Sequence, residues 1–331
     1  MKVLVTGAGG FLGEQLVREL ASQNKHVFAL YRSGYSKDFD QNEWITPIKG
    51  DLLKPESIFK QIGTIDRIYH VAAYSNNWAK NPEVFYHVNV GGTLRFFEVA
   101  QQHGVQKIVV TSTAGTIGPA HSDDDLVTED QYRDINFFGD YESSKFILDE
   151  RIQRLVRDGM NIVIVCPTRI FGPGKIDGKG NLISKIISKY VAGKWRVVLG
   201  DGSDQGCYAF IEDVVQGHIL AMEKGKPGEK YLIGSFNITT RDIFHKIDEY
   251  TGKKVFMFNF PFFWLNLYSA LIRPFAKTFN FDPVVTNDWI VKFQRNWYAD
   301  TSKAQKELGF VPTPVEVAIQ KTVDWIKKDI L

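Results

Sequence analysis

Short apolar runs rich in β-branched residues alternate with longer amphipathic stretches through the first half of the chain. The apolar runs, which predict strands, lie at 2–6, 26–30, 67–73, 107–112 and 161–167. Stretches with helical periodicity lie between them, at 11–21, at 82–103 and from Tyr141 onward. Such alternation is typical of right-handed βαβ units, so it predicts a parallel sheet covered by helices on both faces.

The alternation loosens after residue 168. Helical patterns dominate there, at 182–192, 241–250 and 315–327, and the run KYLIG at 230–234 predicts a late return to the sheet. We therefore expect an α/β protein with a Rossmann-type, doubly wound parallel sheet and a smaller, mostly helical C-terminal substrate lobe. The expected boundaries are 1–168, with 213–234 returning to it, for the sheet domain, and 169–212 with 235–331 for the smaller lobe.

Composition narrows this picture by exclusion. The 331 residues are 44% hydrophobic and 24% charged, as in an ordinary globular protein, and a formal net charge of +2 offers no footprint for nucleic acid. The two cysteines, Cys166 and Cys207, are too few for a disulfide framework or a thiolate cluster, and a cytoplasmic setting fits them best. The histidines show no metal-ligand spacing, so we expect no metal. Because the chain opens directly on a strand, we expect no signal peptide.

A glycine-rich turn joins the first predicted strand to the first helix. Gly7 permits the tight turn, Gly10 lets backbone N–H groups approach a pyrophosphate, and Gly13 allows the helix to pack closely on the strand. Three glycines alone indicate no more than a tight turn, but the flanking strand and helix are the context that dinucleotide binding requires. The expected cofactor-binding positions of this turn are Gly7, Gly9, Gly10, Phe11, Leu12 and Gly13.

The end of the second predicted strand bears on the choice between NAD and NADP. NAD sites usually have a carboxylate there for the ribose 2′-hydroxyl, but this chain has Leu30-Tyr31-Arg32. A guanidinium binds a phosphate with paired hydrogen bonds, so Arg32 favours NADP, with NAD as the alternative; an ordinary exposed loop arginine is the structural alternative. Asp51 and Leu52, after the third strand, are expected near the adenine.

A tyrosine and a lysine four residues apart, Tyr141 and Lys145, predict a proton-transfer site on one helix face. Two other Tyr–Lys pairs in the chain share the spacing. Only Tyr141 lies on the helix that follows the strand end at Thr113, which brings both hydroxyl groups to the sheet edge that carries the glycine turn. A phenol has an ordinary pKa near 10, and we expect the neighbouring ammonium and the positive nicotinamide ring to lower the pKa of Tyr141.

These motifs together resemble those of the extended short-chain dehydrogenase/reductases, which include the NAD-dependent epimerase/dehydratases. The resemblance covers nearly the whole chain, through TGAGGFLG, GDL, HVAA, NVGGT, VVTSTAG, YESSK, PTRIFGPG, IEDVVQGH and DTSKAQKELGF. It implies that Tyr141 is the general acid/base, that Lys145 holds the nicotinamide ribose, and that Thr113 hydrogen-bonds the reacting oxygen. The resemblance also places Val71, Ala72 and Pro167 along the cofactor. Asn89 resembles a family asparagine near the site, with a structural role at a helix start as the alternative.

Departures from the family patterns indicate the branch. Ala114-Gly115 stand where sugar-nucleotide dehydratases have Asp-Glu, and where epimerases acting at two carbons have a cysteine. Gly206-Cys207 stand where UDP-sugar 4-epimerases present an arginine to the diphosphate, although Arg169, Lys175 or Arg196 are conceivable replacements. The strand end TSTAGTIG is instead similar to dihydroflavonol 4-reductases and 3β-hydroxysteroid dehydrogenases.

We therefore expect an oxidoreductase that transfers hydride between NADP(H) and the carbonyl or secondary alcohol of an apolar small molecule. A nucleotide-sugar epimerase is the alternative, and a non-catalytic NADP-binding module is a second. Phe137 and Phe138 are expected to contact the substrate. A homodimer is possible, in which Phe96, Phe97, Phe146 and Ile147 either form a helical interface or belong to the core.

The stretch 256–272 has no charged side chain and is rich in aromatics. Three interpretations are open: it lines an apolar substrate pocket, it forms the core of the lobe, or it makes a shallow, peripheral contact with a membrane. Pro261 interrupts the run, which argues against a transmembrane span.

Overall fold

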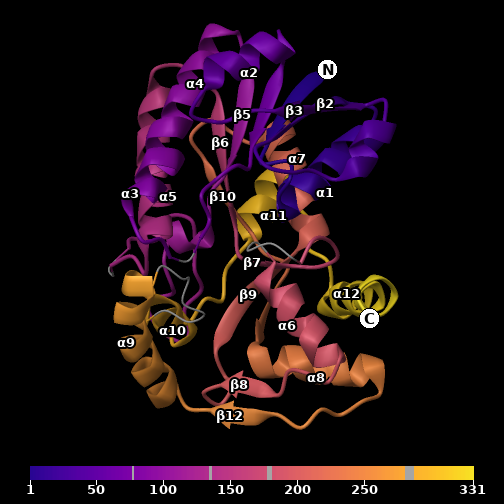
Figure 1. The fold of residues 1–331 in the computed structure, drawn as a ribbon, viewed down its shortest axis with the longest axis vertical. Helices are drawn as coiled ribbons and strands as arrows, with labels where there is room; N and C mark the ends of the chain where they lie inside the picture. Colours follow the sequence, from indigo (N-terminus) through magenta and orange to yellow (C-terminus); the bar gives the residue numbers. More distant parts are fainter. Residues whose placement is uncertain (77, 134–135, 177–180, 280–286) are drawn as a thin grey trace.

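The computed structural model describes residues 1–76, 78–133, 136–176, 181–279 and 287–331. A parallel seven-stranded sheet fills the upper part of the molecule, with strand order β10-β6-β5-β4-β1-β2-β3 (Figure 1). Its strands are β1 (Lys2–Thr6), β2 (His26–Tyr31), β3 (Ile45–Lys49), β4 (Arg67–His70), β5 (Lys107–Thr111), β6 (Ile162–Pro167) and β10 (Lys230–Ile233). The order reverses between β1 and β4, which leaves a crevice at their carboxyl ends. The predicted Rossmann-type fold is confirmed.

Helices cover both faces of this sheet, because consecutive residues in the middle of its strands are apolar and their side chains point to opposite faces. In β1, Val3 and Val5 belong to one hydrophobic cluster and Leu4 belongs to the other, and all three are fully buried. On one face lie α1 (Phe11–Ser22) and α7 (Ile211–Lys224), and on the other α2 (Pro55–Ile62), α4 (Thr93–Gln102) and α5 (Asp140–Arg157). Short 3₁₀ turns occupy Lys37–Gln41 and Ala114–Thr116.

The predicted helix over 82–103 is not uniform. It consists of α3 (Glu83–Tyr86), a π-helical stretch at His87–Gly92 and then α4. Such π turns are rare and often mark functional sites, because one extra residue per turn redirects the side chains. Here the turn contains Asn89, which is buried.

The lower part of the molecule combines helices with two small sheets (Figure 1). The helices are α6 (Leu182–Val191), α8 (Thr240–Thr251), α9 (Phe262–Phe279), α10 (Asn287–Phe293) and α12 (Val315–Asp329). One sheet has the order β11-β9-β7, from Phe236–Thr239, Gln205–Phe210 and Arg169–Phe171, and the other pairs β12 (Phe258–Phe260) with β8 (Val197–Leu199). The sequence pattern did not predict β7, β8, β11 or β12, because strands of three or four residues are too short to show a period.

The chain passes between the two parts repeatedly. It descends from β6 to β7, rises from β9 to α7, and descends again from β10 to β11. Near its end, Trp297 bridges to Gly206 of β9 and Ala299 to Val127, and then α11 (Ser302–Leu308) packs against α7 and β10. None of the helices in the described ranges has both the length and the apolar character needed to span a membrane.

Candidate active site

The glycine turn after β1 is shaped by close backbone contacts. Gly7 has a φ of +72°, and a Cβ on it would lie 2.8 Å from the backbone nitrogen of Ala72, so only glycine fits there. A Cβ on Gly13 would collide with the carbonyl oxygen of Gly7, which means that α1 packs directly on the turn. Gly10 at the start of α1 provides no side-chain cap, so the first-turn N–H groups are free to bind an anion such as a pyrophosphate.

The neighbouring segments complete a cradle that fits a dinucleotide. Val71 and Ala72 follow β4 and lie beside the turn, where the Ala72 N–H donates to Thr6 Oγ1 at 3.1 Å. Arg32 directly follows β2 and is exposed. Asp51 is half-buried and its Oδ1 accepts a hydrogen bond from the Leu53 N–H at 3.0 Å, whereas Leu52 is buried in the core.

Two parts of this cradle were not predicted from the sequence. A Cβ on Gly9 would collide with the carbonyl oxygen of Gly34, so the loop after β2 lies over the turn. A Cβ on Gly174 would lie 2.9 Å from the ring of Phe11, so the loop after β7 lies against the first turn of α1. Gly174 belongs to the motif PTRIFGPG, which was recognised in the sequence. The sequence near it does not indicate that this loop packs on α1.

Tyr141 and Lys145 lie in the first two turns of α5, at the carboxyl edge of the sheet. Lys145 is 1% exposed. The pKa of His70, at the end of β4, is lowered to about 3, mainly by the burial of the imidazole and further by the positive charge of Lys145. His70 is therefore neutral at ordinary pH and holds Thr6 and Thr93 through its two ring nitrogens, at 3.1 and 3.2 Å. The predicted convergence of the strand ends and the Tyr–Lys helix is present.

The expected lowering of the Tyr141 pKa is wrong for the protein alone. Burial raises the pKa of Tyr141, and the negative charges of Glu142 and Asp149 raise it further. Burial also lowers the pKa of Lys145, an effect that Asp149 partly opposes. The cause is desolvation, which penalises the phenolate and the ammonium alike. Any lowering of the tyrosine pKa must come from the positive ring of a bound cofactor.

Asn89 connects the loop after β4 to α5. Its Oδ1 accepts a hydrogen bond from the Tyr74 N–H at 2.7 Å, and its Nδ2 donates to Ser144 Oγ at 3.0 Å. Ser144 directly precedes Lys145, so this hydrogen bond ties the π-helical stretch to α5 at the position next to Lys145. Asn89 lies in the π-helical stretch that directly precedes α4, and its hydrogen bonds join two segments, so the interpretations as a site residue and as a structural residue at a helix start both stay predictions.

Asp149 was missed by sequence analysis and anchors the same helix to β5. It is fully buried, and its Oδ2 accepts a hydrogen bond from Ser112 at 2.9 Å and lies 3.4 Å from Lys230 Nζ. Because Asp149 follows Lys145 by four residues, it shares the helix face of Tyr141 and Lys145. The Ser112 bond sets Thr113, the next residue, against the start of α5.

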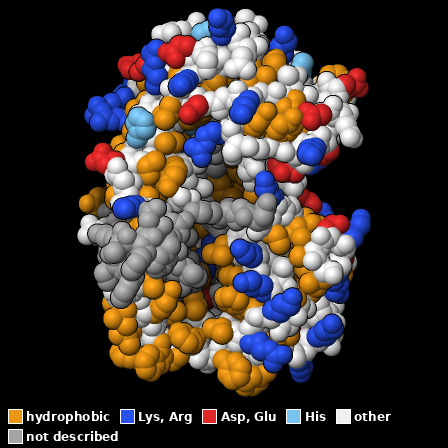
Figure 2. All heavy atoms as spheres, in the orientation of Figure 1, with side chains coloured by type: hydrophobic (Ala, Val, Ile, Leu, Met, Phe, Trp, Pro, Cys, Tyr) orange, Lys and Arg blue, Asp and Glu red, His pale blue; other side chains and the backbone are white. Residues whose placement is uncertain are grey.

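A cavity of about 270 Å³ adjoins this edge and opens between the upper and lower parts, on a face that Figure 2 shows to be hollowed. It is lined by Thr113, Ala114, Gly115, Val127, Glu142, Pro167, Thr168, Arg169, Ile170, Leu182, Ile183, Cys207, Lys292, Phe293, Trp297 and Ala299. Thr113 and Pro167 are the predicted site residues among them. Glu142 of α5 belongs to this wall, whereas Tyr141 and Lys145 are not among its described lining residues.

Both cations among the described residues of the cavity wall are paired with carboxylates. Arg169 Nη1 lies 3.1 Å from Asp204 Oδ2 and 3.2 Å from the Tyr208 hydroxyl, and its guanidinium lies over the ring of Phe293 at 4.7 Å. Lys292 forms an ion pair with the buried Glu142. Gly206 leaves the space that the Arg169 guanidinium occupies, since a Cβ there would collide with Nη1.

The aromatic predictions need correction. Phe138 is buried against Trp297, at 5.8 Å between ring centroids, and Phe137 packs on Phe146 at 4.9 Å, so neither is part of the described cavity wall. Phe293 and Trp297 take that place. No residue of the stretch 256–272 is among the described lining residues of the cavity, and eight of its large apolar side chains are exposed, although Met257 packs against the core.

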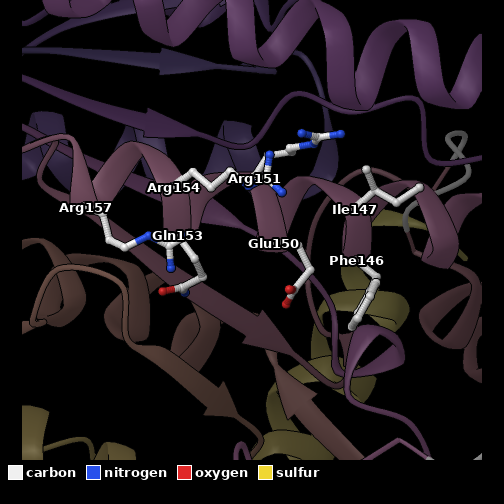
Figure 3. A pocket seen from close by; sticks show the side chains of 7 residues that line it. All are labelled: Phe146, Ile147, Glu150, Arg151, Gln153, Arg154 and Arg157. Atoms are coloured by element: carbon white, nitrogen blue, oxygen red, sulfur yellow. The ribbon is translucent and has the colours of Figure 1, made fainter.

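A second hollow, of about 470 Å³, lies on the outer side of α5, away from the chemistry. Figure 3 shows side chains of α5 around it, among them Phe146, Ile147 and three arginines. Phe96 and Phe97 are fully buried and belong to the core. Only Phe146 and Ile147 of the four predicted interface residues are therefore accessible.

Comparison with known families identifies the chain. Residues 3–234 match the NAD-dependent epimerase/dehydratase family. The chain belongs to this family. The predicted resemblance to extended short-chain dehydrogenase/reductases is thereby confirmed, and so are its status as an enzyme and its NAD-type cofactor class. No cluster of three or more His, Cys, Asp or Glu side chains that could hold a metal occurs in the described part of this family member.

Three curated family members illustrate the branch. A Synechocystis protein, named provisionally as a dihydroflavonol 4-reductase, is 29% identical over 98% of this chain and 94% of its own. The 2-alkyl-3-oxoalkanoate reductase of Stenotrophomonas maltophilia is 30% identical over 69% and 67% of the two chains. The mouse sterol-4-alpha-carboxylate 3-dehydrogenase (decarboxylating) is 26% identical over 97% and 90%. These relatives support the oxidoreductase interpretation.

Solved structures agree with the fold. The crystal structure of gox2253 has a TM-score of 0.81 with 27% identity and 98% coverage of both chains. The UDP-glucose 4-epimerase of Thermotoga maritima has a TM-score of 0.79 with 22% identity and full coverage of both chains. At that identity the likeness concerns the fold alone.

Proposed function

We propose that this family member is a cytoplasmic, NADP-preferring reductase of an apolar ketone, or the corresponding alcohol dehydrogenase. One arrangement supports the proposal: Tyr141 and Lys145 lie at the start of α5, which follows the strand end at Thr113, and Thr113 lines a cavity whose two described cations are paired with carboxylates. The cytoplasmic assignment is supported by Cys166 and Cys207, which are both free, buried thiols.

The protein residues manage the proton. When bound, the dinucleotide supplies or accepts the hydride at the carbonyl carbon. Thr113 and Tyr141 donate hydrogen bonds to the substrate oxygen, and Tyr141 releases its proton to that oxygen as negative charge develops there. The raised pKa of Tyr141 keeps the phenol protonated in the free protein, which suits an acid in the reductive direction. Lys145 then assists the return of a proton to the phenolate.

The electrostatics of the cavity support an uncharged substrate. A sugar-nucleotide diphosphate needs unpaired cations or backbone donors, but Arg169 is paired with Asp204 and Lys292 with Glu142. The apolar wall consists of Leu182, Ile183, Ile170, Phe293 and Trp297. We propose that 169–212 and 235–331 supply most of this substrate site, and that 1–168 and 213–234 hold the dinucleotide.

The test is a substrate panel with two readouts. Purified protein is incubated with NADPH and uncharged apolar ketones, including oxosteroids, and separately with UDP-sugars. We expect loss of NADPH absorbance with a ketone and an alcohol product of equal amount. Unchanged dinucleotide together with inversion of a sugar carbon would contradict the reductase and establish the epimerase. Dinucleotide binding without turnover of any compound would favour the non-catalytic module.

The preference for NADP has its own prediction. Arg32 is exposed directly after β2, and no described residue pairs with it, so its guanidinium is free to bind a 2′-phosphate. A charge-assisted contact of this kind contributes about 1.5–3 kcal/mol, so Arg32→Ala is expected to weaken NADPH binding about 10–100-fold. NADH binding should change less than twofold, because NADH has no 2′-phosphate. Equal losses for both dinucleotides, measured by fluorescence titration, would remove this role from Arg32.

We also propose a homodimer through the outer face of α5. Phe146 and Ile147 are half-buried there, beside Glu150 and a row of arginines that a second copy can pair (Figure 3). Sedimentation equilibrium is expected to give twice the chain mass. Ile147→Asp is expected to give the monomer mass with an unchanged circular dichroism spectrum, and a wild-type monomer at micromolar concentration would contradict the proposal.

A further inference from the structure

The lower end of the molecule carries a continuous aromatic patch. Its side chains are between 38% and 69% exposed: Phe256, Phe258, Phe260, Phe263, Trp264, Leu267, Tyr268 and Leu271. Figure 2 shows hydrophobic side chains gathered along this end, where Figure 1 places β12 and α9. We call this set the aromatic patch.

The patch is an ordered surface formed by one helix face and one edge strand. In α9 its members recur at positions 263, 264, 267, 268 and 271, which is the spacing of a single helix face. An apolar face of that kind normally points into a core, as it does in α1, but here it points to solvent. In β12, Phe258 and Phe260 are exposed along a strand that pairs with β8.

The patch is larger than most soluble proteins tolerate. An aromatic side chain buries roughly 150–250 Å² when it is covered. At the observed exposures, eight large side chains leave on the order of 800 Å² of apolar surface in water. The largest patch of a typical monomer is about 300–600 Å², and larger ones mark protein or membrane contacts.

The charges around the patch are mostly positive, with Asp201 as a described acid at the border, since the Gly200 N–H that precedes it donates to the Phe260 carbonyl oxygen at 2.9 Å. The sequence has no Asp or Glu from 178 to 200 or from 251 to 281, and these two segments supply β8, β12 and α9. Lys194, Arg196, Lys253 and Lys254 are all exposed at its border. Arg196 lies directly beside the patch, since its carbonyl oxygen accepts a hydrogen bond from the Phe258 N–H at 2.8 Å.

We propose that the aromatic patch docks on the surface of an anionic lipid bilayer. Trp, Tyr and Phe side chains enter the boundary between headgroups and acyl chains, and the bordering cations contact anionic headgroups. A second copy of the chain suits this surface less well, because a two-fold contact would place the same excess of cations opposite one another. The proposal stands on surface residues and does not depend on the reductase activity.

Vesicle flotation tests the proposal. The full chain is mixed with neutral phosphatidylcholine vesicles or with vesicles that also contain phosphatidylglycerol, at low and high salt. We expect flotation with the anionic vesicles, weaker at high salt. The double variant Phe263→Ser with Trp264→Ser is expected to lose flotation, and Val311→Ser with Val317→Ser, which changes two exposed apolar residues elsewhere, is expected to keep it.

Charge variants separate the two contributions. Lys253→Gln with Lys254→Gln is expected to lower the partition onto anionic vesicles about fivefold per cation removed, and to leave binding to neutral vesicles unchanged. Because these side chains are exposed, melting temperature and NADPH binding should match the wild type in every variant. Absence of flotation at low salt would overturn the proposal. Self-association that the Phe263/Trp264 variant abolishes, without vesicle binding, would assign the patch to a second copy instead.

Discussion

Tyr141→Phe is expected to lower kcat about 10²–10⁴-fold while leaving the Kd for NADPH within twofold of the wild-type value. The substitution keeps the ring and its packing and removes only the hydroxyl that gives its proton to the substrate oxygen. Steady-state kinetics with the ketone found in the substrate panel, together with fluorescence titration of NADPH, measures both quantities. Tyr250→Phe is the matched control, because Tyr250 also precedes a lysine by four residues but is exposed and bonded to Asp324.

The pH dependence adds a second test of the same role. Burial raises the pKa of Tyr141, so the phenol of the free protein stays protonated through neutral pH. We therefore expect kcat/KM for reduction to be flat through neutral pH and to fall only in the alkaline range. A fall in kcat/KM below pH 7, or a loss of NADPH binding by Tyr141→Phe, would contradict the assignment of Tyr141 as the acid.

Gly13→Ala is expected to weaken dinucleotide binding at least tenfold, or about 1.4 kcal/mol. The new Cβ meets the carbonyl oxygen of Gly7, which is backbone and cannot rotate away. The first turn of α1 must therefore move from the glycine turn, and its N–H groups move with it. Fluorescence titration with NADPH and with NADH should show similar losses, since the pyrophosphate is common to both.

Gly91→Ala provides the control for this variant. Gly91 has no described neighbour within 4 Å of the position that a Cβ would take, and it lies outside the dinucleotide cradle. It is expected to bind NADPH like the wild type. Wild-type affinity in Gly13→Ala, with a lowered melting temperature alone, would show that the glycine serves packing and not the anion site.

The upper sheet and its site were predictable because each rests on local sequence. The strand at 107–111 is buried on both faces over its apolar centre, 108–110, and the residues just after it lie at the carboxyl edge by the geometry of parallel sheets. The position of Thr113 follows from that alone. Selecting Tyr141 and Lys145 among the Tyr–Lys pairs needed one further inference, namely which predicted helix follows that strand.

The parts that were missed depend on contacts between distant positions. The Glu142–Lys292 pair joins residues 150 positions apart, and Arg169 occupies the space that Gly206 leaves, with no local pattern for either. The surroundings of the aromatic stretch 256–272 could not be predicted for another reason: its helical period predicts an apolar face but not whether protein or solvent covers that face. The predicted direction of the Tyr141 pKa shift was wrong for the protein alone, because desolvation depends on the packing of the whole site.

The chain crosses between the upper and lower parts at several described places, which bears on how a substrate enters. Proteins that open on a hinge usually join their two halves by one or two flexible segments, so that one half swings. Here the two parts are joined at several places: between β6 and β7, between β9 and α7, between β10 and β11, and by the segment from Trp297 to α11. Access to the cavity is therefore expected to depend on rearrangement of side chains and short loops at its mouth, with the distance between cofactor cradle and substrate wall nearly constant through the catalytic cycle.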